Sequence, residues 1–296
     1  MRVFVTGATG FVGSAVVQEL IGAGHHVIGL VRSDAAAQSL AATGAEVLQG
    51  DLKDLDSLQR GAGAADAVIH TAFIHDFTNL KESCEVDERA IAALGAALAG
   101  SKRLLIVTSG TALVSPGRLV TEDLPVPAAS ILPRVSELAA QRVADLGVPV
   151  SILRLPPSVH GDGDHGFVPL LIGVARQKGA AAFIGDGLNR WAAVHRLDAA
   201  RLYRLALEQG TGGARYHAIG DSGVPFRDIA AIIGRHLNVP VISQAPEAAA
   251  EHFGWFAHFA ALDTPASSSL TQQQLGWQPR EAGLIADLDH PRYFGG

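Results

Sequence analysis

Short apolar runs recur along the first half of the chain, and each run is apolar throughout rather than alternating with polar residues. They lie at Val3–Thr6, Val27–Val31, Val47–Gln49, Ala67–His70, Leu104–Ser109 and Val150–Leu155. Runs of this kind are typical of strands that are covered on both faces. Helix-like stretches separate them, at Gly13–Gly24, Ala35–Thr43, Leu55–Gly61, Asp87–Gly100 and Arg134–Leu146. The alternation predicts an α/β fold with a doubly wound parallel sheet.

A glycine-rich sequence lies directly between the first apolar run and the first helix-like stretch. Glycine is required there because a side chain would block the tight turn, the approach of a pyrophosphate to backbone N–H groups, or the contact of helix and strand. The pattern predicts a dinucleotide site in a Rossmann domain. The residues expected to contact the cofactor in this turn are Thr6, Gly7, Thr9, Gly10, Phe11, Val12 and Gly13.

The rhythm changes after Leu155, where a double proline and a loop rich in glycine and aspartate follow. Helices are predicted beyond it at Phe167–Lys178, Asp198–Gln209 and Phe226–Leu237. We therefore expect a dinucleotide-binding Rossmann domain over residues 1–155. Residues 156–296 are expected to form a smaller substrate-binding region, with segments that return to the Rossmann core.

Composition and charge exclude several classes of protein. The chain has 296 residues and a net charge of −6, with no run of Lys or Arg, so we expect no nucleic-acid partner. Its longest apolar stretch, Ala90–Gly100, falls short of the ~18 residues that cross a bilayer, and we expect no membrane partner. The single cysteine, Cys84, favours a reducing compartment, and we expect a cytoplasmic protein.

The end of the second predicted strand bears on which dinucleotide is bound. An NAD site needs a carboxylate there for the ribose 2′-hydroxyl, whereas this strand ends in Arg32-Ser33-Asp34. The planar guanidinium of Arg32 suits a 2′-phosphate, with Ser33 beside it. We expect NADP, and NADPH in preference to NADH. NAD is the alternative, through Asp34.

The chain resembles the extended short-chain dehydrogenase/reductases of the NAD-dependent epimerase/dehydratase superfamily. Beyond the glycine motif, Gly50–Leu52 is similar to the family's adenine-contacting turn, and Ile69–Ala72 to the segment under the cofactor. Pro156–Gly161 is similar to the loop beside the nicotinamide, and Val194–Asp198 and Leu275–Pro279 to parts of the second domain. Further cofactor contacts that the resemblance implies are Asp51, Leu52, Thr71, Ala72, Phe73, Thr108, Pro156, Ser158 and Val159.

The chain departs from this family at its catalytic pair, a tyrosine followed four residues later by a lysine. None of its three tyrosines, Tyr203, Tyr216 and Tyr293, has that lysine. Registering Val135–Glu137 on the family's helix places Pro133 at the tyrosine position and Glu137 at the lysine position. The chain is therefore most similar to atypical members that lack the pair.

Other side chains near the predicted strand ends are candidates for proton transfer. Ser109 and Thr111 could orient a substrate, with an ordinary polar turn as the alternative. His75 could donate a proton, because an imidazole titrates near a pKa of ~6.5, or be a structural loop histidine. Arg134 could polarise a carbonyl, bind an acidic substrate, or simply begin a helix. We expect His195 and Asp198 to cap and orient a helix.

These features predict an NADP-dependent oxidoreductase that moves hydride between nicotinamide and a small carbonyl or alcohol substrate. One alternative is a nucleotide-sugar epimerase or dehydratase. Another is a non-catalytic NADP-binding sensor or regulatory protein. Family resemblance implies a homodimer through the helices at Asp87–Gly100 and Arg134–Leu146.

Overall fold

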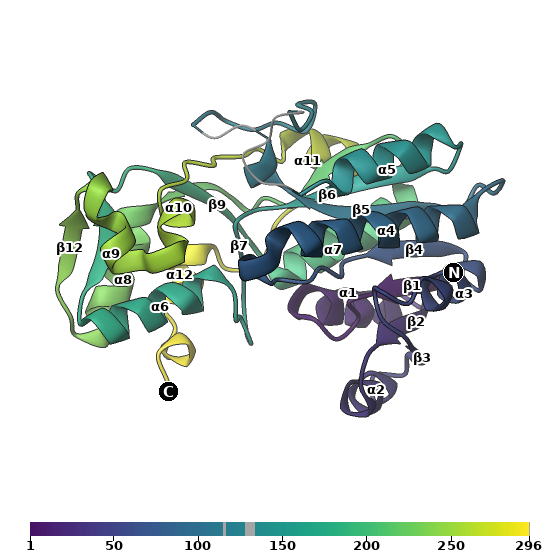
Figure 1. The fold of residues 1–296 in the computed structure, drawn as a ribbon, viewed down its shortest axis with the longest axis horizontal. Coiled ribbons are helices and arrows are strands. Elements are labelled where there is room, and N and C mark those ends of the chain that lie inside the picture. Colours follow the sequence, from purple (N-terminus) through teal and green to yellow (C-terminus); the bar gives the residue numbers. More distant parts are fainter. Residues whose placement is uncertain (115–116, 128–133, 296) are drawn as a thin grey trace.

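The computed structural model describes residues 1–114, 117–127 and 134–295 (Figure 1). Within these residues, seven parallel strands form the main sheet in the order β10-β6-β5-β4-β1-β2-β3. Val3 and Val5 face one apolar layer and Phe4 faces the other, which is why the predicted strand has no polar side. The predicted doubly wound parallel sheet is confirmed. Its strands are β1 (Arg2–Thr6), β2 (His26–Val31), β3 (Glu46–Gln49), β4 (Ala67–His70), β5 (Leu105–Gly110), β6 (Val150–Leu155) and β10 (Arg215–His217).

Helices cover both faces of the main sheet (Figure 1). One layer contains α1 (Phe11–Gly22), α2 (Asp34–Ala41) and α7 (Arg196–Gln209). The other contains α3 (Leu55–Gly63), α4 (Leu80–Leu98) and α5 (Ser136–Asp145). A Cβ atom added at Gly95 of α4 would lie 2.4 Å from Cγ1 of Val143 in α5. The missing side chain therefore lets these two helices pack closely.

A smaller part of the molecule lies beyond the carboxyl edge of the main sheet, at the left of Figure 1. Its core is aromatic: the ring of Trp191 lies 5.0 Å from that of Phe226 and 6.0 Å from that of Phe256. Its strands form a β11-β9-β7 sheet and a β12-β8 pair. They are β7 (Ser158–His160), β8 (Ala181–Ile184), β9 (Arg190–His195), β11 (Asp221–Pro225) and β12 (Val241–Gln244). The remaining α-helices beyond β6 are α6 (Phe167–Lys178), α8 (Phe226–Leu237), α9 (Ala249–Phe253), α10 (Ala257–Ala260), α11 (Ser269–Leu275) and α12 (Leu284–Leu288).

Two elements from the second half of the chain belong to the main sheet and its cover. Strand β10 pairs with β6 at the edge of the sheet, and α7 packs on α1. Short 3₁₀ turns complete the described elements: η1 (Phe77–Asn79), η2 (Thr111–Leu113), η3 (Pro246–Ala248), η4 (Gly254–Phe256) and η5 (Pro291–Tyr293).

Most predicted helices agree with the structure, and α6 and α8 have the predicted bounds. Helix α4 begins at Leu80 rather than at the predicted Asp87, because Asp76 caps η1 by accepting from the N–H groups of Thr78 and Asn79, and α4 continues from that turn. The strands β7, β8, β9, β11 and β12 are absent from the sequence-based prediction. They are short, and their hydrogen-bonded partners are remote in sequence.

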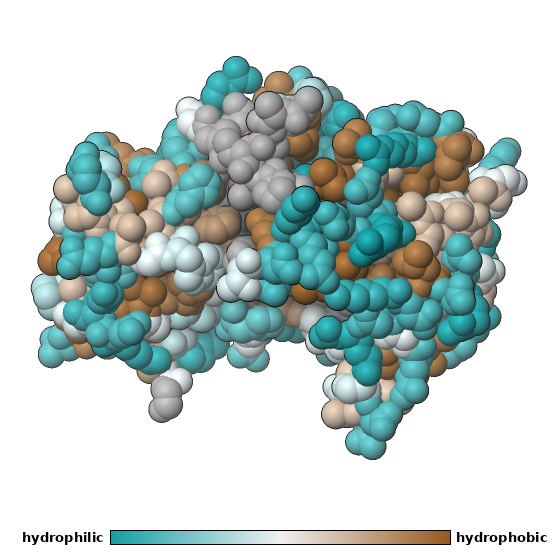
Figure 2. All heavy atoms as spheres, in the orientation of Figure 1, coloured by the Kyte–Doolittle hydropathy of each residue, from teal (hydrophilic) through white to brown (hydrophobic). Residues whose placement is uncertain are grey.

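Hydrophobic and hydrophilic residues are interspersed on the face shown in Figure 2. The outline of the molecule is notched between the part that carries α6 and the part that carries α2 (Figure 2). In the part of the chain that the structure describes, no helix combines the length and apolar character needed to cross a bilayer.

Candidate active site

The turn between β1 and α1 is closed tightly around its glycines. Gly7 has a φ of +69°, and a Cβ atom there would lie 2.9 Å from Cα of Ala72. A Cβ atom at Gly13 would lie 2.0 Å from the carbonyl oxygen of Gly7. Gly10 is the N-cap of α1 and provides no side-chain acceptor for the first N–H groups of the helix. The turn therefore presents uncapped donors at a helix N-terminus, which suits a pyrophosphate.

The end of β2 holds its three polar residues in different ways. Ser33 caps α2 by accepting from the N–H of Ala36 at 3.3 Å. Asp34 accepts a hydrogen bond from Nε2 of Gln49 at 2.8 Å. Arg32 is exposed, and no described residue forms a hydrogen bond or ion pair with it. Its guanidinium is therefore available to an anion.

The ends of β1 and β4 are joined directly. The Thr71 hydroxyl donates to the carbonyl of Thr6 at 2.7 Å, and the N–H of Ala72 donates to Oγ1 of Thr6 at 3.4 Å. Asp51 stabilises the turn after β3 by accepting from the N–H of Lys53 at 2.8 Å. The predicted segments around Thr6, Asp51 and Thr71 therefore all end at the carboxyl edge of one sheet.

Three hydroxyl groups at the end of β5 have different surroundings. The Thr108 hydroxyl donates to the carbonyl of His70 at 2.7 Å and lies 2.6 Å from the hydroxyl of Tyr203. Ser109 and Thr111 are 1% and 0% exposed, yet their hydroxyls form no hydrogen bond within residues 1–114, 117–127 and 134–295. Buried hydroxyls normally have partners, so these two are the ones that could still bind a ligand.

A buried chain of polar groups runs from β1 to the start of α5. Oγ1 of Thr6 lies 2.8 Å from Nδ1 of His70, whose Nε2 lies 3.0 Å from Oδ1 of Asp87. The Ser136 hydroxyl donates to Oδ2 of Asp87 at 2.5 Å, and Nε of Arg134 donates to Oγ of Ser136 at 2.9 Å. These hydrogen-bonded groups therefore connect the glycine turn between β1 and α1 to Arg134.

Asp87 is ionised within this chain. Burial by itself would raise the pKa of Asp87, but the hydrogen bond and charge of His70, the charge of Arg134 and the hydrogen bond from Ser136 outweigh it and hold the pKa below its ordinary value. An ionised Asp87 is an acceptor only, so Nε2 of His70 donates to it.

Arg134 and His75 both lie against Phe73, just beyond β4. The guanidinium carbon of Arg134 lies 4.2 Å from the centre of the Phe73 ring, and its Nη2 donates to the carbonyl of Thr108 at 3.2 Å. The His75 ring meets Phe73 edge to face, with 5.3 Å between centres. Desolvation of the imidazole and the charges of Arg134 and His165 lower the pKa of His75, although the residue as a whole is exposed.

The loop after β7 contacts Phe11, at the start of α1. The ring of His165 meets that of Phe11 edge to face at 5.6 Å, and the guanidinium of Arg196 lies 4.9 Å from the centre of the same ring. Arg196 also donates to the carbonyl of Asp162 at 2.8 Å. His165 and Arg196 are absent from the sequence-based site, because only the folded chain brings them to Phe11.

The predicted nicotinamide loop leads into β7. Pro156 and Ser158 are buried, and Val159 is half-buried. The Ser158 hydroxyl is a third buried group that forms no hydrogen bond within the described part of the chain. No described contact joins these residues to the glycine turn, so their place in a cofactor site stays a prediction.

The position expected for the family's lysine is occupied by a structural ion pair. Nε and Nη2 of the fully buried Arg154 donate to the two carboxylate oxygens of Glu137 at 2.7 and 2.8 Å. Glu137 is therefore a paired carboxylate and cannot supply the positive charge that a lysine would supply at this position. Pro133, at the tyrosine position, lies outside the described residues.

The three tyrosines are also engaged elsewhere. Tyr203 is fully buried, and burial raises the pKa of its hydroxyl. The Tyr216 hydroxyl accepts from the N–H of Thr211 at 3.2 Å, and the Tyr293 hydroxyl donates to Asp287 at 2.9 Å. The predicted cap at the start of α7 is confirmed for His195, whose Nδ1 accepts from the N–H of Leu197 at 3.3 Å. Asp198 does not cap the helix and instead accepts from the N–H groups of Arg280 and Glu281 at 2.8 and 3.0 Å.

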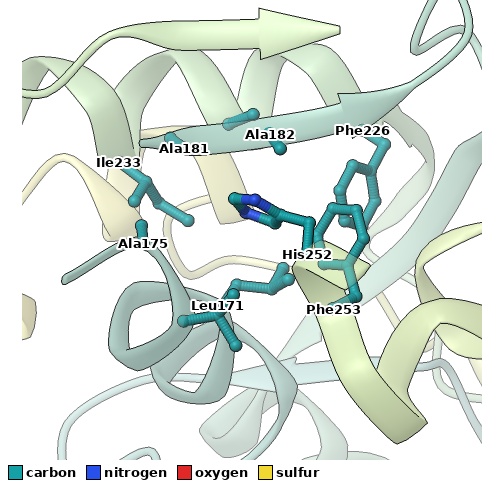
Figure 3. Close-up of a pocket in the computed structure, with 10 residues that line it drawn as sticks. Leu171, Ala175, Ala181, Ala182, Phe226, Ile233, His252 and Phe253 are labelled. Carbon is teal, nitrogen blue, oxygen red and sulfur yellow. The ribbon is translucent and has the colours of Figure 1, made fainter. Parts of the chain in front are cut away.

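A separate cavity lies in the smaller part, between α6, β8 and α8 (Figure 3). The imidazole of His252 points into it among Leu171, Ala175 and Ile233 (Figure 3). The cavity encloses ≈ 10 Å³, room for about one water molecule. It is too small for a substrate.

Comparisons with known proteins bear on the family and on the fold. The model of the NAD dependent epimerase/dehydratase family matches residues 3–219. An uncharacterized protein of Schizosaccharomyces pombe is 51% identical over 295 residues, which cover 99% of this chain and 100% of that protein. The 4-hydroxy-2-methyl-3-oxo-4-farnesyl-3,4-dihydroquinoline-1-oxide ketoreductase of Stigmatella aurantiaca is 27% identical over 79% of this chain and 72% of its own. Among solved structures, the dTDP-glucose 4,6-dehydratase DesIV of Streptomyces venezuelae, with NAD and TYD bound, has a TM-score of 0.79 at 23% identity, over 99% of this chain and 97% of that one.

Proposed function

The chain belongs to the NAD-dependent epimerase/dehydratase family, and we propose that it is an NADP-dependent oxidoreductase that moves hydride between nicotinamide and a small carbonyl or alcohol substrate. The observation that carries this proposal is the placement of His75 and Arg134 on Phe73. Phe73 follows Ala72, which touches the glycine turn. A proton donor and a fixed positive charge thus lie next to the expected cofactor site.

The glycine turn fits a dinucleotide, because its N–H groups are uncapped and a Cβ atom at Gly7 or Gly13 would collide with backbone. The turn would hold the pyrophosphate. Arg32 would hold a 2′-phosphate, since it is unpaired among the described residues while Asp34 is held by Gln49. When bound, NADPH supplies the hydride.

The chain's own groups have three tasks in this reaction. Arg134 supplies positive charge where negative charge develops on the carbonyl oxygen. The His75 imidazole hands a proton to that oxygen. Ser109 and Thr111 orient the substrate through hydroxyls that have no partner within the described residues. This arrangement does the work that a tyrosine and a lysine do in other members of the family.

Isotope transfer tests the proposal directly. The protein is incubated with NADPH that carries deuterium at the transferable position and with a panel of aldehydes and ketones, and the products are analysed by mass spectrometry. We expect deuterium in the alcohol product, and much less with an Arg134→Gln variant. The exposed Arg142 of α5 offers a matched control as Arg142→Gln. Tight NADPH binding with no transfer to any compound would overturn the proposal and favour a non-catalytic NADP-binding protein.

A further inference from the structure

Arg134 is held in a fixed orientation by three contacts. Its Nε donates to Ser136 at 2.9 Å, its Nη2 donates to the carbonyl of Thr108 at 3.2 Å, and one face of its guanidinium lies on the ring of Phe73. A long side chain that is already immobilised loses little conformational entropy when it binds a ligand. Arg134 is therefore preorganised.

The guanidinium keeps donors in reserve. It carries five N–H groups, and the described residues accept from only two of them, one on Nε and one on Nη2. The remaining N–H groups on Nη1 and Nη2 can donate to the oxygens of a carboxylate. Within the described chain, no carboxylate bonds to Arg134 directly, and Asp87 reaches it only through Ser136.

The ionised carboxylate near Arg134, that of Asp87, is already bonded to His70 and Ser136. His75 lies on the same ring of Phe73, and its imidazole carries no negative charge in either of its protonation states. On the other side of the glycine turn, Arg196 and His165 lie against Phe11. An anion entering this region meets fixed positive charge.

We propose that the substrate is a small oxo acid, with its carboxylate on the open edge of Arg134 and its carbonyl between Arg134 and His75. This inference rests on the proposed function. Arg134 and His75 contact the same phenyl ring, at 4.2 and 5.3 Å from its centre, and the charge of Arg134 acts on the His75 imidazole, so the two substrate groups that they meet lie near each other. A carbonyl one or two carbons from the carboxylate satisfies this condition. The carbonyl carbon accepts one hydride and its oxygen one proton, which gives a hydroxy acid and the oxidised dinucleotide.

Binding measurements test the anion site without relying on turnover. Oxamate is a small oxo-acid analogue with a carboxylate, and oxamide is its neutral counterpart. Titrated calorimetrically into NADPH-saturated protein, oxamate should bind at least about tenfold more tightly than oxamide. Arg134→Gln should weaken oxamate by about 10- to 100-fold, Arg134→Lys by less, and Arg142→Gln not at all. Equal affinity for oxamate and oxamide in the wild-type protein would overturn the inference, and this comparison needs no variant.

Turnover separates this inference from the proposed function. The substrates are short 2-oxo and 3-oxo acids and their methyl esters, with the isotope-transfer measurement described above. Preference for the acids, lost in Arg134→Gln but kept in Arg142→Gln, supports the inference. Equal turnover of acids and esters would overturn the substrate class and leave the oxidoreductase intact. Transfer to neither, despite NADPH binding, would overturn the proposed function and with it the oxo-acid reaction.

Discussion

Two regions at the carboxyl end of the main sheet differ in whether their polar groups have hydrogen-bond partners. In the closed cluster, formed by Glu137, Arg154 and His217, the polar groups bond to one another. Arg154 donates to both oxygens of Glu137 and lies 3.2 Å from Nε2 of His217, whose Nδ1 lies 2.8 Å from the carbonyl of Ser267. In the open rim, formed by Arg32, Ser109, Thr111 and Arg134, donors remain without partners among the described residues.

The contrast begins at two adjacent residues of α5. Ser136 turns toward Asp87 and Arg134, on the open rim, while Glu137 pairs with Arg154 in the closed cluster. A buried charge without a partner destabilises the fold by several kcal/mol, so the charged groups of the closed cluster must find their partners within the folded chain. The half-buried Arg134 keeps donors for a ligand. Changes in the closed cluster should therefore affect stability, and changes in the open rim should affect binding and rate.

The largest expected effect is on the closed cluster. Arg154→Met removes the two hydrogen bonds to the largely buried Glu137 carboxylate, which keeps only Arg215 at 3.8 Å, and we expect the free energy of unfolding to fall by about 3 kcal/mol. Denaturant titration followed by circular dichroism measures this. Where the variant is folded, its NADPH affinity should equal that of the wild type. A loss of NADPH affinity with unchanged stability would place Arg154 in the cofactor site instead.

The same cluster predicts a pH dependence of stability. Burial lowers the pKa of His217, so the folded protein resists protonation that the unfolded chain accepts. The contribution of neutral His217 is therefore fully present above the ordinary histidine pKa of ~6.5 and is lost as the pH falls below it. We expect His217→Gln to flatten this part of the unfolding curve measured against pH. An unchanged slope would contradict a neutral, buried His217.

On the open rim, the largest effect should come from His75. We expect His75→Ala to lower kcat/KM for reduction by about 100-fold, the lower range for loss of a general acid, without loss of stability. The lowered pKa means that, as the pH rises, the imidazole loses its proton before the pH reaches the usual value of ~6.5. The wild-type rate should therefore already fall with rising pH below that value. The decline should be absent in the variant. NMR titration of the imidazole supplies an independent value, and a midpoint at or above 6.5 would contradict the assigned surroundings.

Arg32 should affect affinity for one cofactor only. We expect Arg32→Ala to weaken NADPH by about 10- to 100-fold, the loss expected for a charge-assisted contact, and to leave NADH unchanged. Calorimetric titration of both cofactors measures this. Asp34→Asn is the matched control, since Asp34 is held by Gln49 and should not matter for NADPH. Equal wild-type affinities, or loss of NADH binding in Asp34→Asn, would favour an NAD site.

The parts of this architecture that the sequence predicts are those with local causes. The β1 turn requires glycine within a few residues of the strand, and the strands of the main sheet are apolar on both faces, so both can be recognised from short segments. Strand β12 pairs with β8 across the intervening β9 to α8 segment, and neither strand carries a distinctive pattern. The conformation of β12 therefore depends on its pairing with β8.

The same reasoning applies to the candidate site. His75 and Arg134 are both recognisable as candidates, but their common contact with Phe73 depends on how the loops after β4 and before α5 meet. Glu137 at the lysine position is visible in the sequence, whereas its pairing with Arg154 requires β6 to lie beside α5. Residue types therefore indicate the chemistry, and long-range packing decides which of them are open to a ligand.

The smallest expected effects concern the buried hydroxyls at the end of β5. Because Ser109 and Thr111 form no hydrogen bond within the described residues, Ser109→Ala and Thr111→Val should raise the free energy of unfolding by up to about 1 kcal/mol. Each should lower kcat/KM by roughly three- to tenfold, the value of one hydrogen bond to substrate. Thr108→Val is the control, because the Thr108 hydroxyl bonds to His70 and Tyr203, and its loss should destabilise the protein. If Ser109→Ala destabilised the fold as Thr108→Val does, Ser109 would belong with the paired groups of the fold. If the free energy of unfolding rose in Ser109→Ala and fell in Thr108→Val, Ser109 would be kept at a cost in stability because the substrate needs it.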